Sequence, residues 1–172
     1  MKKVILIGYM ASGKSTVAKI LSTKLGISFF DLDSLIENRT KLSIENIFKE
    51  KGEIYFRRME QELFKEILFS TEQGIISTGG GTPCYANNHL LLNNEGVISI
   101  YLKASIDSLY ERLLNEKNQR PLVANKTQEE LKEFIAKHLF ERSFYYNQAT
   151  FKVAIDGKKP EEIAEEIMRL LV

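Results

Sequence analysis

The stretch from Gly8 to Ser15 has the residue types and the spacing that bind phosphate groups. It runs Gly-Tyr-Met-Ala-Ser-Gly-Lys-Ser and fits the pattern of a glycine, four free positions and then Gly-Lys-Ser. In such a loop the backbone N–H groups and the positive end of the next helix face phosphate oxygens. Lys14 would reach the β- and γ-phosphates, and the Ser15 hydroxyl would bind Mg²⁺. The stretch therefore predicts a nucleoside triphosphate site with these contacts: Gly8, Ala11, Ser12, Gly13, Lys14, Ser15 and Thr16.

The neighbours of this stretch supply the context that a phosphate-binding loop needs. The apolar run Val4–Ile7 directly precedes it and has the composition of a buried strand. After it, apolar residues recur at helical spacing from Val17 to Leu25, and Gly26 is a typical helix stop. A strand before and a helix after favour phosphate binding over a simple glycine-containing turn.

Two acids, Asp31 and Asp33, follow the next strand candidate at Ile27–Phe30. Open α/β sheets bind their ligands at the carboxyl ends of the strands, so this position is typical of a site. Alternation along an extended chain would point both carboxylates to the same side, into one cleft. The alternative is a solvated Asp-Leu-Asp turn that caps the following helix.

A run of three glycines follows another strand candidate, at residues 74–78. Gly79, Gly80 and Gly81 would allow a ligand to approach the backbone closely. This strand has no Asp at its end, although phosphate-loop proteins often place a metal-binding acid there. A metal ion would therefore depend more strongly on Asp31.

The elements that would position these residues alternate along the chain. Further strands are expected at 97–102 and 151–155, and helices at 34–40, 43–52, 53–71, 87–92, from 105, from 127 past 142, and from 160. Alternation of this kind predicts an α/β fold with three layers, αβα, around a central, mainly parallel five-stranded sheet. We expect one domain over residues 1–172, with a mobile polar loop at about 115–126.

Composition excludes several classes of protein. The net charge of +1 gives no support to nucleic-acid binding, and no apolar run is long enough to span a membrane. The lone cysteine, Cys84, cannot form an internal disulfide, which suits the cytoplasm, and we expect it to have a packing role. His89 and His138 have no partners at metal-ligand spacing.

Taken together, the motifs resemble those of the shikimate kinases from end to end. They comprise the phosphate loop, Asp31-Leu32-Asp33, Phe56-Arg57-Arg58-Met59-Glu60, Gly79-Gly80-Gly81, Arg120-Pro121-Leu122 and Glu141-Arg142. The resemblance implies a P-loop NTPase type of fold and transfer of the γ-phosphoryl group of ATP to the 3-hydroxyl of shikimate, with Mg²⁺, in aromatic amino acid biosynthesis. It also implies a monomer with a small-molecule substrate.

The resemblance assigns roles to single residues. It makes Lys14, Asp33 and Arg120 catalytic: Asp33 as the base that accepts the 3-hydroxyl proton, and Arg120 on a lid at about 115–126. Asp31 would help Ser15 to hold Mg²⁺. The substrate would be bound by a helical region at about 33–62 and by these residues: Asp33, Arg57, Gly79, Gly80, Gly81 and Arg142.

The clamp arginines also make chemical sense, because a guanidinium binds a carboxylate with two hydrogen bonds. Taken singly, Arg57 and Arg142 would more often be solvated helix residues, as we expect for Arg58. Glu60 lies three residues after Arg57 and could orient it by an ion pair.

The adenine side of the predicted site departs most from the family pattern. The resemblance places adenine near Arg112 and near the stretch 155–160, where Lys158 stands in place of an expected arginine. Another departure is Ala11, where a glycine is more usual.

Two other functions remain open from the sequence. The chain could be another small-molecule P-loop kinase, such as a gluconate or nucleoside monophosphate kinase. It could also be a regulatory module that binds ATP without turning it over, although the set of Lys14, Ser15, Asp33 and Arg120 argues against this.

Overall fold

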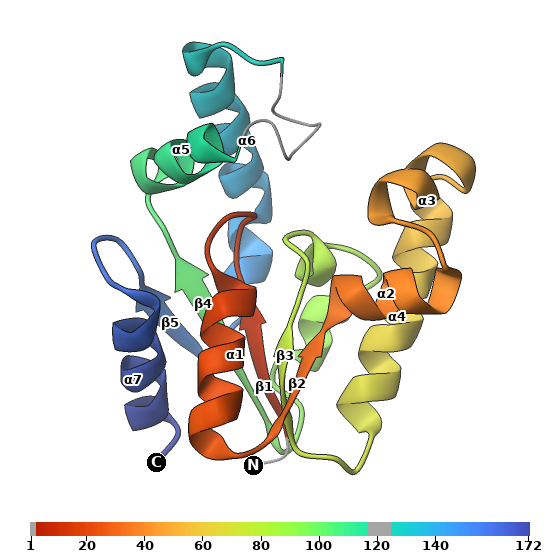
Figure 1. Cartoon of the computed structure of the whole chain (residues 1–172), viewed down its shortest axis with the longest axis vertical. Coiled ribbons are helices and arrows are strands. Elements are labelled where there is room, and N and C mark those ends of the chain that lie inside the picture. The colour runs from red at the N-terminus through yellow and green to blue at the C-terminus, as the bar shows by residue number, and fades with distance from the viewer. Residues whose placement is uncertain (1–2, 117–124) are drawn as a thin grey trace.

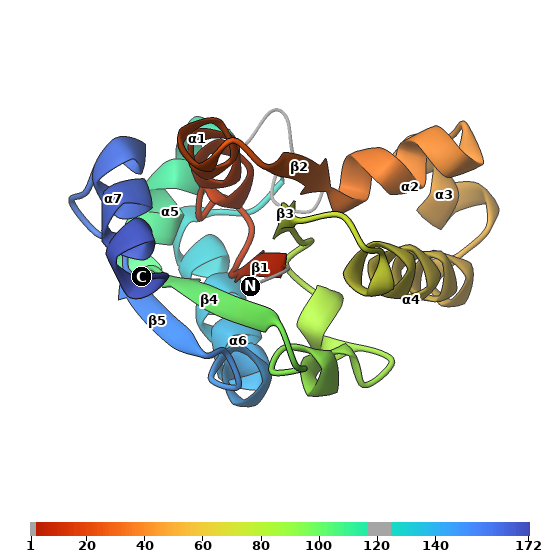
Figure 2. The same ribbon diagram turned by 90° about the horizontal axis from the view of Figure 1, so that it is seen from below.

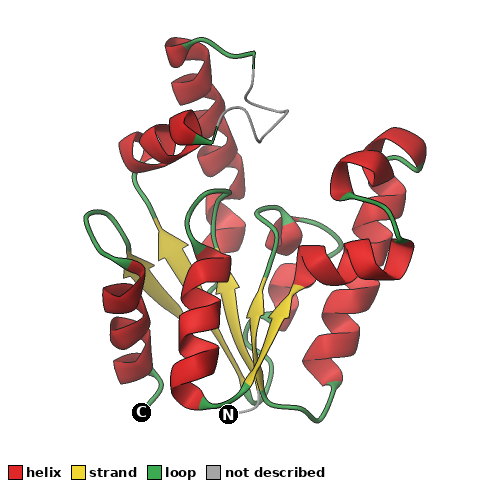
Figure 3. Cartoon of the chain, viewed as in Figure 1, coloured by secondary structure: helices red, strands yellow, loops and turns green. Residues whose placement is uncertain are grey.

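Five parallel strands form the centre of the fold. The computed structural model describes residues 3–116 and 125–172. The strands are β1 (Lys3–Ile7), β2 (Ser28–Asp31), β3 (Gly74–Ser77), β4 (Val97–Lys103) and β5 (Phe151–Ala154). Their order in the sheet is β2-β3-β1-β4-β5, and every pair is parallel. Because all strands point the same way, the loops that follow β1, β3 and β4 lie at one end of the sheet (Figure 3).

Helices cover the sheet and complete the three predicted layers. They are α1 (Lys14–Leu25), α2 (Leu32–Thr40), α3 (Ile44–Glu50), α4 (Glu53–Phe69), α5 (Ile106–Asn115), α6 (Gln128–Tyr146) and α7 (Pro160–Leu170). Helices α1 and α7 lie on one side of the sheet and α6 on the other (Figures 1 and 2). Helices α2, α3 and α4 pack together beside the β2 edge (Figure 1). None of the helices in the described residues is long and apolar enough to cross a membrane.

The core explains why the central strands are so apolar. All of β1 and β3 is buried, as expected for parallel strands covered on both faces. Leu21 of α1, Phe64 of α4 and Ile135 of α6 are fully buried in the same core. This packing fixes the helices against the sheet, and so it also fixes their polar residues near the carboxyl ends of the strands.

Local sequence signals set most helix ends. Gly26 ends α1 with a left-handed backbone at φ 65°. Ser43 and Ser105 cap α3 and α5 through their side chains, and Thr127 forms a capping box with Glu130 at the start of α6. The helices predicted from these signals are confirmed.

Several predicted boundaries differ from those in the structure. Helix α2 begins at Leu32, so Asp33 lies in its first turn, and the argument from strand alternation does not hold. The residues predicted as a helix at 87–92 form a short 3₁₀ turn, η2, at Asn88–Leu91. Helix α4 ends at Phe69 rather than near residue 71 because Ser70 already has an extended backbone. The predicted lid lies mainly outside the described residues.

Candidate active site

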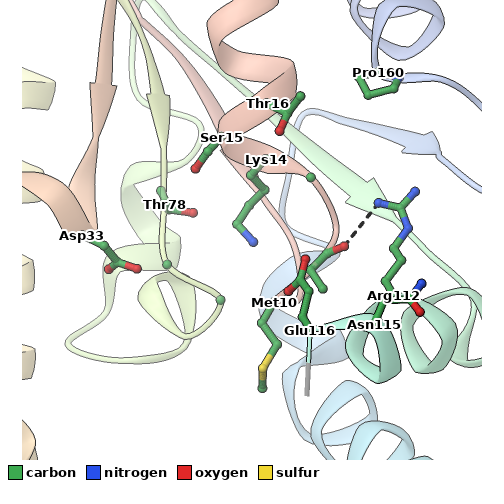
Figure 4. Close-up of a pocket in the computed structure, with 14 residues that line it drawn as sticks. Met10, Lys14, Ser15, Thr16, Asp33, Thr78, Arg112, Asn115, Glu116 and Pro160 are labelled. Atoms are coloured by element: carbon green, nitrogen blue, oxygen red, sulfur yellow. Dashed lines mark hydrogen bonds between the residues drawn. The ribbon is translucent and has the colours of Figure 1, made fainter. Parts of the chain in front are cut away.

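A cavity of about 520 Å³ opens at the carboxyl ends of the strands. Its wall joins the phosphate loop to the start of α2, the end of β3 and the end of α5 (Figure 4). The lining residues are Met10, Ala11, Gly13, Lys14, Ser15, Thr16, Asp33, Thr78, Gly79, Gly80, Arg112, Asn115, Glu116 and Pro160. In Figure 4, Lys14 lies between Asp33 on one side and Arg112 on the other. The cavity therefore brings the predicted phosphate site and the predicted base together.

The main chain of the loop holds Lys14 in place. The ammonium donates to the carbonyl oxygens of Gly8 and Tyr9 at 2.8 and 2.9 Å, and the side chain of Ser12 lies 3.4 Å away. Lys14 and Ser12 are buried, while Thr16 reaches the cavity wall. A buried ammonium beside the N-terminus of α1 is a strong attractor for phosphate oxygens.

Ser15 lies at the meeting point of β2 and β3. Its hydroxyl donates to Asp31 Oδ2 at 2.7 Å and lies 3.1 Å from the hydroxyl of Ser77. The sheet register pairs Asp31 with Ser77 on the neighbouring strands. Asp31 Oδ1 accepts from the backbone N–H of Ser34 at 3.0 Å and caps α2. The capping alternative is thus correct for one oxygen of Asp31, whereas the second oxygen is turned toward the phosphate loop.

Asp33 has the electrostatic environment of a base. Burial, helped by the negative charges of Glu60 and Asp31, raises the pKa of Asp33 to about 6 against the lowering effect of Lys14. Asp33 Oδ1 would lie 3.3 Å from a Cβ placed on Gly79. The carboxylate is therefore ionised at neutral pH, yet its proton affinity is well above that of an exposed aspartate.

Arg57 and Glu60 form the ion pair that the sequence suggested. Arg57 Nη1 lies 2.9 Å from Glu60 Oε1, and the other Glu60 oxygen accepts from the Thr82 hydroxyl at 2.9 Å. Glu60 is almost completely buried, with 1% of its surface exposed. The Nε of Arg57 is buried without a hydrogen-bond partner among the described residues. Such an orphaned donor is typical of a guanidinium that awaits an anion.

The glycine run brings both arginines close to the backbone. A Cβ on Gly81 would lie 2.8 Å from Arg57 Nη2, and one on Gly80 would lie 3.2 Å from Arg142 Nη1. Any larger residue at Gly81 would displace the Arg57 side chain. The three glycines thus leave room for the guanidinium groups and connect them to the cavity.

Arg142 comes from α6 and lies close to Gly80 and to the phosphate loop. Its Nη1 lies 3.5 Å from the Tyr146 hydroxyl, which donates to the Gly80 carbonyl at 2.6 Å. Burial raises the pKa of Tyr146, so its hydroxyl stays a donor. The guanidinium of Arg142 also lies 5.6 Å from the ring centre of Tyr9 in the phosphate loop. The arginine is thus placed beside both halves of the site.

Of the three other residues predicted to contact the nucleotide, one lines the cavity, one does not, and one falls outside the described residues. Arg112 lines the cavity and donates to the Ala11 carbonyl at 3.2 Å. Lys158 instead pairs with Glu166 at 2.6 Å and is not among the cavity-lining residues, although Pro160 from the same stretch is. Arg120 lies outside the described residues.

Some residues of the site were not expected from the sequence. Ser77 bonds to Ser15 near the point where a metal-binding acid was missing, and a polar residue at the end of a buried strand could have signalled it. The hydroxyl of Tyr9 lies 2.9 Å from Nδ1 of His138 and joins the loop to α6. Tyr85 stacks on Arg57. These last two contacts join distant parts of the chain, so no local signal could have found them.

Cys84 lies close to both arginines without the features of a reactive thiol. Burial raises the pKa of Cys84 to about 11, against the lowering effect of Arg142 and Arg57. The thiol is therefore protonated at neutral pH, as expected for a packing role.

The fold and the site together define a P-loop protein with a nucleotide side and a small-molecule acceptor side. The family model for shikimate kinase matches residues 10–172. Shikimate kinases of Flavobacterium johnsoniae and Flavobacterium psychrophilum are 57% and 50% identical to this chain, and each alignment covers 99% of both proteins. The chain belongs to the shikimate kinase family.

Solved structures agree with this family. The crystal structure of shikimate kinase from Bacteroides thetaiotaomicron matches with a TM-score of 0.90 at 34% identity, over 99% of this chain and 98% of that one. Shikimate kinase from Acinetobacter baumannii, in complex with shikimate, matches with a TM-score of 0.88 at 28% identity, over 99% and 93% of the two chains.

Proposed function

We propose that this chain is an ATP-dependent shikimate kinase that phosphorylates the 3-hydroxyl of shikimate and releases ADP. Family membership supports the activity. Within the molecule, the observation that carries it is the cavity in which Lys14 of the phosphate loop and Asp33 of α2 line the same wall. Phosphoryl transfer requires the donor phosphate and the acceptor hydroxyl to be held side by side, and this arrangement can do so.

Asp33 is proposed as the base for the acceptor. The 3-hydroxyl oxygen forms a bond to the γ-phosphorus while the bond from that phosphorus to the β–γ bridging oxygen breaks, and the hydroxyl proton passes to Asp33. The pKa of about 6 suits this role because the carboxylate is ionised at pH 7 and still holds a proton effectively.

Arg57 and Arg142 are proposed to bind the carboxylate of shikimate. The buried Nε of Arg57 supplies a donor that has no partner among the described residues, and Glu60 fixes the opposite end of the guanidinium. Backbone N–H groups of Gly79, Gly80 and Gly81 would add contacts at the point where the two arginines meet the glycine run.

On the donor side, Lys14 and the loop N–H groups are proposed to hold the β- and γ-phosphates. The pair of Ser15 and Asp31 fits Mg²⁺, because this ion prefers one or two protein oxygens together with phosphates and water. No group of three or more His, Cys, Asp and Glu side chains within 3–116 and 125–172 forms a metal cage. When bound, Mg²⁺ would neutralise charge on the phosphates.

Arg112, Lys158 and Arg120 are proposed to contact the nucleotide. Arg112 lies in the cavity wall and suits a nucleotide contact. Lys158 would have to leave Glu166 to reach the nucleotide. Arg120 is proposed as the lid arginine on the strength of the family resemblance.

A coupled assay of ADP release, with and without shikimate, tests the function. We expect ADP only when shikimate is present. ADP release that is independent of shikimate but depends on gluconate or a nucleoside monophosphate would replace this proposal with another small-molecule kinase. ATP binding without ADP release under any condition would support a regulatory module.

We also propose that the chain acts as a monomer in the cytoplasm, as the resemblance implies. Light scattering on a gel-filtered sample would test the first part, and a mass near 19.8 kDa is the expected result.

A further inference from the structure

Arg57 is covered by an aromatic ring that comes from a distant part of the chain. The central carbon of its guanidinium lies 3.8 Å from the ring centre of Tyr85. The ring of Phe56 lies 5.0 Å from the same carbon. Tyr85 follows the 3₁₀ turn η1 (Thr82–Cys84), which comes directly after the glycine run. A guanidinium at this distance over a tyrosine face gains both cation–π attraction and stacking.

Hydrogen bonds fix the turn that carries Tyr85. Thr82 donates to Glu60 at 2.9 Å, on the same buried carboxylate that pairs with Arg57. On the other side, Gln61 of α4 donates to the Ala86 carbonyl at 3.0 Å. Within the turn, the backbone N–H of Asn88 donates to the Tyr85 carbonyl at 3.0 Å. The chain is thus bonded to α4 on both sides of Tyr85, and these bonds fix the position of the ring.

Each edge of the Arg57 guanidinium has a different environment. Glu60 takes Nη1, Tyr85 covers a face, and Nε is buried without a hydrogen-bond partner among the described residues. Nε lies 3.9 Å from Glu53 Oε1, which is too far for a hydrogen bond. A planar group that is held at one edge and on one face can rotate little, so its remaining donors keep a fixed direction.

We propose that Tyr85 is a positioning residue for the substrate carboxylate, acting through Arg57. It holds the guanidinium in the orientation that receives the carboxylate and shields the ion pair from water. Arginine loses side-chain freedom when it binds an anion, so an arginine that is ordered beforehand binds more tightly. Water exclusion strengthens the same contact. This inference rests on the proposed function, because shikimate supplies the carboxylate.

Substitution of Tyr85 by Ala tests the proposal. We expect the KM for shikimate to rise about 3- to 30-fold, which corresponds to the range measured for cation–π contacts. Because Tyr85 is not among the residues that line the cavity, kcat and the KM for ATP should stay within about twofold of their starting values. Phe69→Ala, at the exposed aromatic residue that ends α4, the helix that carries Arg57, is a matched control that should leave all constants unchanged.

Two further variants separate stacking from bulk. Tyr85→Phe keeps the ring and should behave like the unchanged protein, whereas Tyr85→Leu keeps apolar volume without an aromatic face and should behave like Tyr85→Ala. Full activity of the Leu variant would refute the stacking role. Thermal unfolding should give the same midpoint for the Phe and Leu variants, because Tyr85 is 38% exposed and contributes little to the core.

A double-mutant cycle shows whether Tyr85 acts through Arg57. In an Arg57→Ala background, Tyr85→Ala should change the KM for shikimate by less than about twofold, since the group that it positions is gone. An equal, additive rise would overturn the inference. If the unchanged chain forms no shikimate-dependent ADP, the proposed function fails and this inference falls with it. If the chain is active and Tyr85→Ala leaves the KM unchanged, only this inference falls.

Discussion

The proposed donor side and the proposed acceptor side of the site are built in different ways. On the donor side, one continuous stretch from Gly8 to Thr16 holds the proposed phosphate contacts, and its own carbonyl oxygens hold Lys14. On the acceptor side, Asp33, Arg57 and Arg142 come from α2, α4 and α6 and are held by side chains such as Glu60. The first side depends on backbone shape, and the second depends on charge and burial at single residues.

The largest expected effect tests the acceptor side at its base. Asp33→Asn keeps the size of the side chain but cannot accept the proton, so kcat should fall by about 10² to 10⁴. The KM for ATP should change little, because the phosphate loop is separate. Steady-state kinetics with both substrates varied would measure this. Asp107→Asn, at an exposed acid of α5, is the control.

The pH profile gives the same test a second readout. In the unchanged protein, kcat/KM for shikimate should fall about tenfold from pH 7 to pH 5, because the pKa of about 6 leaves Asp33 increasingly protonated. The Asn variant should lack this limb. Near-normal turnover of Asp33→Asn would remove Asp33 from the catalytic role.

The same substitution should stabilise the fold, which sharpens the contrast between the two sides. The folded-state pKa of Asp33 lies above its model value of 3.8, so the folded state binds the proton more tightly than the unfolded state. Ionised Asp33 therefore lowers the free energy of unfolding, and this loss develops as pH rises from about 4 to 6. We expect Asp33→Asn to be more stable by up to about 3 kcal/mol at pH 8, with the gain absent near pH 3.

Chemical denaturation at both pH values measures this gain. An Asn variant that is less stable at pH 8 would show that burial of the ionised carboxylate costs the fold nothing.

A somewhat smaller effect is expected at the carboxylate clamp. Arg142→Ala should raise the KM for shikimate about 10- to 150-fold, the usual effect of losing a hydrogen bond to a charged group. The KM for ATP should stay nearly constant if Arg142 binds the carboxylate of shikimate and not the nucleotide. Arg58→Ala removes an exposed arginine of α4, next to Arg57 in the chain, and should have no effect. An unchanged KM for shikimate in Arg142→Ala would refute the clamp.

The smallest expected effect tests the backbone of the donor side. Ala11 has a left-handed conformation with φ 64°, which strains any residue with a Cβ. Ala11→Gly should relieve this strain and raise the free energy of unfolding by about 0.5 to 1 kcal/mol. Thermal denaturation would detect it. In the right-handed helix α1, Ala18→Gly should instead destabilise the protein by about 1 kcal/mol.

The same contrast explains how much the sequence could predict. The phosphate loop, the alternating elements and the parallel sheet follow from local patterns, and the structure confirms them. The sequence places Asp33 correctly after the second strand, but it predicts an extended chain there, whereas Asp33 lies in the first turn of α2. Aspartate can follow a strand or open a helix, so the residue type alone does not decide between the two. The helix begins at this point because the side chain of Asp31 accepts a hydrogen bond from the backbone N–H of Ser34.

Contacts across the fold were beyond local patterns. The ion pair of Arg57 with Glu60 lies within one helical turn and could be inferred from spacing. The Tyr85 ring lies 28 positions from Arg57 in the chain, and only the packing of the glycine run against α4 brings them together. The ion pair of Lys158 with Glu166 could not be predicted either, since Glu166 belongs to the last helix.

The two oxygens of Asp31 have a consequence for repeated turnover. One oxygen holds the start of α2, and the other meets the Ser15 hydroxyl. In the proposed reaction, contacts at Ser15 would form and break as nucleotides arrive and leave. Since the bond to Ser34 uses a different atom, these exchanges can proceed without unwinding the helix that carries Asp33. A spent nucleotide could thus be exchanged for ATP while Asp33, the proposed base, keeps its position for the next shikimate.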